Sequence, residues 1–128
     1  MPNRPLAAGL ALAASLSLPP LPAAARPLTS VPAAFVGQWV LTGDRARCGD
    51  NAYDSGLNLQ RDMVGFYESG GMVRRVRWLD RRTIRITGVS TDDEGVSGPV
   101  SYTFRLSPDG QRLTDRSHGD GSVYVRCR

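Results

Sequence analysis

The stretch FVGQWVL, residues 35–41, alternates between two faces and decides the fold class. Phe35, Trp39 and Leu41 fall on one face, with Gly37 between the first two. A repeat of two residues is the period of a β-strand, because successive side chains of a strand point to opposite sides. The stretch therefore predicts a strand, and a tryptophan in its centre predicts that one face of the strand is buried.

The same alternation continues to the end of the chain, and no stretch has a convincing helical period. Turn sequences interrupt the alternation at SGG (69–71), DR (80–81) and SPDG (107–110), and an acidic loop is expected at 90–99. The expected strands lie at residues 35–42, 57–68 (one strand or two short ones), 72–79, 83–89, 100–106, 111–116 and 122–127. Consecutive hairpins predict an all-β fold, an up-and-down antiparallel meander of seven or eight strands closed into a small barrel, since closure removes exposed strand edges.

The first 25 residues have the features of a secretory signal peptide. A basic start with Arg4 precedes LAAGLALAASLSL at 6–18, an uncharged run too short to cross a bilayer as a helix. Three small residues ending at Ala25 complete the cleavage pattern. We therefore expect a signal peptide at 1–25, an N-terminal tail at 26–34 and a β-barrel domain at 35–128. The mature protein is expected in the periplasm or outside the cell, with no membrane span after cleavage.

The two cysteines, Cys48 and Cys127, are expected to form one structural disulfide. Their even number in an exported chain and the absence of a CxxC pair favour a disulfide over a redox or metal site. The bond would join the region after the first strand to the end of the last strand. These two strands are neighbours in a closed barrel, so the disulfide supports closure.

The charge of the chain is modest, with 16 arginines and lysines against 12 acidic residues and a net charge of +4. This balance argues against nucleic acid as a partner, since nucleic-acid binders carry a concentrated basic stripe. Arginines are densest at residues 74–85, where Arg75 and Arg77 of one strand would lie against Arg85 of the next. Such a group is either a patch for an anionic ligand or partner, or a solvated outer face.

Two features of the first strand resemble known families. The glycine-x-tryptophan pair formed by Gly37 and Trp39 is similar to the opening strand of lipocalin-type (calycin) barrels. GQWVLTG at 37–43, followed by Cys48, resembles the start of the Inh family, small exported bacterial inhibitors of secreted metalloproteases. That resemblance implies a barrel whose N-terminal segment enters a protease cleft. The Inh family joins its first cysteine to a second one nearby, whereas here the partner is Cys127, so a separate group of small exported barrels is the alternative.

The expected function is binding without catalysis, because no acid/base pair or nucleophilic constellation has a suitable spacing, and we expect no cofactor or metal. Inhibition of a secreted protease by a monomer is the first interpretation. The alternatives are a carrier of a small hydrophobic ligand, with a hollow barrel, and a structural protein of the cell envelope. For inhibition, the resemblance implies a contact tail made of Arg26, Pro27, Leu28, Thr29, Ser30, Val31 and Pro32.

Overall fold

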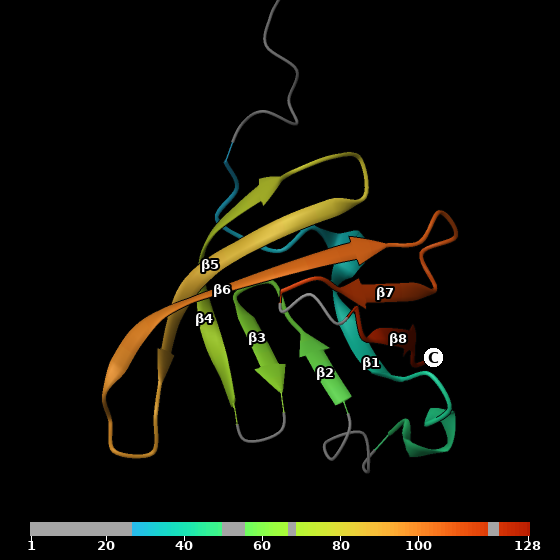
Figure 1. Cartoon of the computed structure of the whole chain (residues 1–128), viewed down its shortest axis with the longest axis horizontal. Helices are drawn as coiled ribbons and strands as arrows, with labels where there is room; N and C mark the ends of the chain where they lie inside the picture. Colours follow the sequence, from blue (N-terminus) through green and yellow to red (C-terminus); the bar gives the residue numbers. More distant parts are fainter. Residues whose placement is uncertain (1–26, 50–55, 67–68, 118–120) are drawn as a thin grey trace, which may run out of the picture.

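The computed structural model describes residues 27–49, 56–66, 69–117 and 121–128. Within these ranges eight antiparallel strands follow one another and close into a barrel (Figure 1), as the sequence predicts. The strands are β1 (Gly37–Leu41), β2 (Gly56–Leu59), β3 (Met63–Phe66), β4 (Ser69–Trp78), β5 (Thr83–Thr91), β6 (Ser97–Leu106), β7 (Arg112–Asp115) and β8 (Val123–Arg126). Two short 3-10 helices, η2 (Ala33–Phe35) and η3 (Arg45–Arg47), flank β1. The predicted signal peptide lies outside the described residues.

Two local expectations are wrong. The expected turn at 69–71 is the beginning of β4, which pairs there with β3. A Cβ atom on Gly70 would lie 2.5 Å from the backbone oxygen of Val64, so this glycine allows close approach of two strands rather than a turn. The expected loop at 90–99 is shorter, because β5 runs to Thr91 and β6 begins at Ser97. These strand ends bury no complete face, so hydrophobic alternation could not mark them.

Side chains fill the interior of the barrel. Inward positions of the strands alternate with exposed ones, and those inward residues form one continuous core. The largest fully buried side chains are Trp39, Phe35, Phe104, Leu57, Leu59, Ile84, Ile86 and Leu113. An eight-stranded barrel is just wide enough for its own side chains to fill it. The fold therefore positions binding groups on the surface and at the rims rather than inside.

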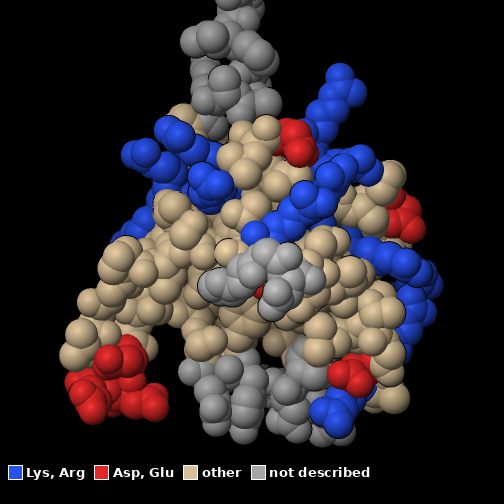
Figure 2. Space-filling model, viewed as in Figure 1, with Lys and Arg blue, Asp and Glu red and all other residues tan. Residues whose placement is uncertain are grey.

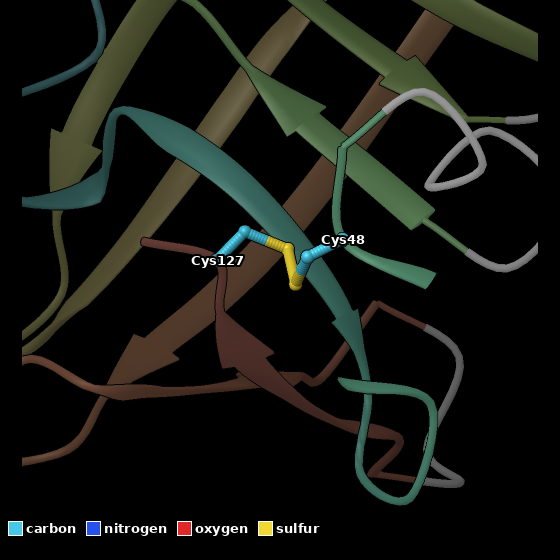
Figure 3. The surroundings of a disulfide bond; sticks show 2 residues. All are labelled: Cys48 and Cys127. Atoms are coloured by element: carbon cyan, nitrogen blue, oxygen red, sulfur yellow. A yellow bond between two sulfur atoms is a disulfide. The ribbon is translucent and has the colours of Figure 1, made fainter. Parts of the chain in front are cut away.

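The disulfide lies on the outside of the seam where β1 meets β8 (Figure 3). Cys48 and Cys127 have Cα atoms 5.5 Å apart and pack on Val40 and Val125, which face each other across the seam. The backbone N–H of Cys127 donates to the carbonyl of Gln38 at 2.8 Å, so pairing of the two terminal strands continues up to the bond. The predicted disulfide is confirmed, and it fits an oxidising compartment.

Replacing both cysteines by alanine should lower the free energy of unfolding by about 4 kcal/mol. The reason is that the bond spans 79 residues of sequence and so removes much of the freedom of the unfolded chain. Urea unfolding followed by tryptophan fluorescence measures the change. A loss of less than about 1 kcal/mol would contradict the expectation that the bond restricts the unfolded chain.

Candidate functional site

An open trough of about 410 Å³ is lined by the start of β4, the end of β5 and the start of β6. The β5–β6 hairpin projects from this end of the barrel (Figure 1). The volume of the trough falls in the range of small-molecule sites, roughly 300–1,000 Å³. Most of its side chains carry hydroxyl groups, and the apolar ones are few. The residues that characterise it are Ser69, Ser90, Thr91, Val96, Ser97 and Tyr102.

The trough exists because β4 changes partners along its length. Its first residues pair with β3, and from Met72 onward it pairs with β5. A register shift between Val73 and Arg75 bends the strand at this point. Gly88 lies opposite Val73, and a Cβ atom there would be only 1.9 Å from the carbonyl oxygen of Met72. Gly88 thus lets β4 and β5 approach closely at the bend. Before Met72 the first residues of β4 pair with β3 instead, so they lie apart from the end of β5.

Tyr102 is the aromatic residue in the lining of the trough, and it packs on two further rings. The centroid of the Tyr102 ring lies 5.7 Å from the centroid of the Phe66 ring and 6.1 Å from the centroid of the Phe104 ring. Burial, with a smaller contribution from Asp115, raises the pKa of the Tyr102 phenol above its usual range. The phenol therefore stays protonated at physiological pH and can donate or accept a hydrogen bond. This chemistry suits binding of a polar group rather than proton transfer.

The N-terminal segment packs along the barrel over most of its described length. Leu28 forms an antiparallel bridge with Val76, in which each N–H donates to the other's carbonyl, at 2.9 and 2.8 Å. The N–H of Val31 donates to the carbonyl of Arg61 at 2.8 Å, and the Val31 side chain is buried in the core. Two of the residues assigned to a contact tail are therefore anchors that hold the segment on the barrel.

The exposed residues of this segment are few. Pro27 and Thr29 are exposed, while Ser30 and Pro32 are partly covered. Arg26 lies outside the described residues. The structure thus holds Thr29 outward between the anchors at positions 28 and 31, with its backbone fixed on both sides.

Trp39 closes the end of the barrel next to η2. Its indole Nε1 donates to the carbonyl of Phe35 at 3.0 Å, and the guanidinium carbon of Arg126 lies 4.2 Å from the centre of its ring. Arg126 also donates three hydrogen bonds to backbone carbonyls, those of Gly110 at 3.1 Å, Val36 at 2.8 Å and Ala34 at 2.5 Å. The side chain ties the last strand to η2, to the start of β1 and to the turn before β7.

Gly37 is required by the same arrangement. Its φ angle is +150°, which disfavours other residues, and a Cβ atom there would lie 2.9 Å from Nη1 of Arg126. Gly37 and Trp39 thus have structural roles, and Arg126 is the partner that sequence analysis missed. One signal in the sequence could have indicated that Arg126 points inward. Arg126 lies two residues after Tyr124 on β8, so it shares the inward side of the strand with that buried residue.

Comparisons with known proteins identify no relatives, since no protein-family model, curated protein or solved structure matches the chain. The architecture alone, a closed eight-stranded antiparallel barrel, is consistent with a lipocalin-like fold. In the described part of the chain no three histidine, cysteine, aspartate or glutamate side chains are grouped to hold a metal ion. None of the helices there is long and apolar enough to span a membrane.

Two glycines beside the trough should respond differently to alanine. Gly88→Ala should destabilise the fold by about 2 kcal/mol or more, because the added Cβ meets the backbone of Met72. Gly98→Ala should be neutral within about 0.5 kcal/mol, because no atom lies within 4 Å of a Cβ there. Urea unfolding of the two variants checks this. Equal losses would contradict the account of how the trough forms.

Proposed function

We propose that this protein is a non-enzymatic binding protein of the periplasm or extracellular medium, and that it acts on a macromolecular partner. The observation that carries this proposal is the continuous packed core inside the barrel, whose largest side chains are fully buried. A carrier of a hydrophobic ligand needs an internal apolar cavity, whereas Phe104 is fully buried in the core and Trp78 packs on Phe35, with ring centroids 5.7 Å apart. The groups left for recognition lie on the surface.

A secreted metalloprotease is the partner that we propose first. The resemblance of the first strand to the Inh family supports it, and so does the exposed position of Thr29 on an anchored segment. A segment already held in one conformation loses little conformational freedom when a partner binds it. The hydrogen bonds of Leu28 and Val31 also keep the segment on the barrel. It therefore does not enter the cleavage site of a protease as a flexible substrate does.

The geometry favours contact through the packed segment over insertion of a free tail. If cleavage follows Ala25, only Arg26 and Pro27 precede the bridge between Leu28 and Val76. Two residues in extended form reach about 7 Å, which is short for the cleft of a protease. A deletion of residues 26–32 would remove the buried Val31 side chain, so point substitutions of exposed residues are the better test.

The test is a panel of purified secreted metalloproteases assayed with the mature chain in excess. We expect inhibition of at least one protease, and we expect Thr29→Arg to weaken it by about tenfold or more, because a long charged side chain would stand in the contact. Ser122→Arg is the matched control, since Ser122 is also exposed but directly precedes β8, away from the N-terminal segment in the sequence. Circular dichroism establishes that both variants are folded.

Three outcomes count against the proposal. No inhibition of any protease at high excess would reject protease inhibition. Inhibition that Thr29→Arg leaves unchanged would reject the segment as the contact surface. Saturable binding of one fluorescent long-chain fatty acid per chain would contradict a filled interior and favour the carrier alternative.

A further inference from the structure

The outer face of β4, β5 and β6 carries three rows of paired residues with different chemistry. Register places Arg77, Arg85 and Thr103 in the first row, Arg75, Thr87 and Ser101 in the second, and Met72, Val89 and Pro99 in the third. We call these nine residues, together with the acidic tip of the β5–β6 hairpin at residues 92–94, the β4–β6 outer face. Most of their side chains are exposed, while residues of the opposite parity, such as Val76, Ile86 and Phe104, are buried.

The basic end of this face lies toward the β4–β5 turn. Arg77 and Arg85 are directly opposite each other, and both are exposed. Arg75 lies one row further along, at the register shift of β4. Like charges directly opposite each other on a sheet are unfavourable, so three neighbouring arginines favour an anionic group that would cover them.

The centre of the face is apolar. Met72 is 47% exposed, and its neighbours across the sheet are Met63 on one side and Val89 on the other. Pro99 extends the apolar row onto β6. The row thus continues across four strands from β3 to β6.

The acidic end is the tip of the β5–β6 hairpin. Asp92, Asp93 and Glu94 follow directly after β5 and are exposed. Asp92 Oδ1 accepts hydrogen bonds from the N–H groups of Glu94 and Val96, which hold the tip in one shape. Figure 2 shows the acidic tip at the lower left, separated by uncharged surface from arginines at the upper left.

This order of basic, apolar and acidic groups is self-complementary. Counted along β5, Arg85 lies four residues before Val89 and Asp93 lies four residues after it. Arg85 is therefore about 13 Å from the apolar row along the extended strand. Asp93 lies in the turn after β5, so it is within that distance of the apolar row on the other side. A twofold axis through Val89 would bring the arginines of one copy onto the acidic tip of the other, twice, with Met72 and Val89 of both copies in the centre.

We propose that the β4–β6 outer face is the interface of a homodimer, with a second copy of this chain as its occupant. The proposal is independent of protease inhibition, and it differs from the monomer expected from the sequence. An anionic membrane surface fits less well, because the same hairpin that carries Arg85 also carries Asp93 and Glu94, which such a surface would repel. With few apolar residues at its centre, the interface depends on charge and should weaken as salt increases.

The test is analytical ultracentrifugation of the disulfide-bonded chain of residues 26–128 at low salt. We expect a concentration-dependent species with twice the mass of one chain, and we expect its fraction to fall as sodium chloride is raised. Arg77→Glu with Arg85→Glu should abolish the dimer, and so should Asp93→Arg with Glu94→Arg. Arg47→Glu with Arg112→Glu is the matched control, since both residues are exposed and lie outside the face.

Mixing the two charge-reversed variants separates this interface from a general effect of charge. One variant then carries acidic groups at both ends of its face, and the other carries basic groups at both ends. Each repels itself, but together they should form a heterodimer as stable as the original. A monomer at all concentrations, or a dimer that survives both reversals, would overturn the proposal. Binding to phosphatidylglycerol vesicles that depends on Arg77 and Arg85, without a dimer, would assign the face to lipid and also overturn it.

Discussion

One interaction fastens the seam of the barrel at its inner side, the packing of the Arg126 guanidinium over the indole of Trp39. The cation faces the aromatic ring while its N–H groups satisfy three backbone carbonyls at the closed end of the barrel. Gly37 leaves the space that the guanidinium occupies. This contact joins the last strand to the first from the inside of the seam, and the disulfide between Cys48 and Cys127 joins them from the outside.

Closure of the seam determines where this protein can bind anything. A closed barrel of eight strands leaves its interior to its own side chains, so recognition takes place on surfaces that the strands build beyond the core. A single bend of β4, opposite Gly88, produces two such surfaces. On the inner side of the sheet, the bend opens the trough next to Tyr102. On the outer side, the bend lies between the two rows that contain arginines and the apolar row. The N-terminal segment, anchored by the buried side chain of Val31, provides a third surface for binding.

Much of the fold was predictable because period-two alternation is a local signal. It correctly marked the strands that bury one face, and the cysteines correctly marked the seam. The ends of β5 and β6 were missed because they extend past the core and carry no such signal. Arg126 was missed because an arginine reads as a surface residue until its strand partner is known, and Val31 because a short segment has no period. The binding surfaces depend on register between strands, which alternation alone does not specify.

The most direct test of this account is the free energy of unfolding of Arg126→Leu, measured by urea denaturation beside Arg112→Leu. We expect a loss of about 3 kcal/mol for Arg126→Leu, because three backbone carbonyls lose a charged donor. Arg112 is exposed on β7, so its replacement should change stability by less than about 0.5 kcal/mol. Equal and small changes in both variants would contradict the claim that Arg126 closes the barrel.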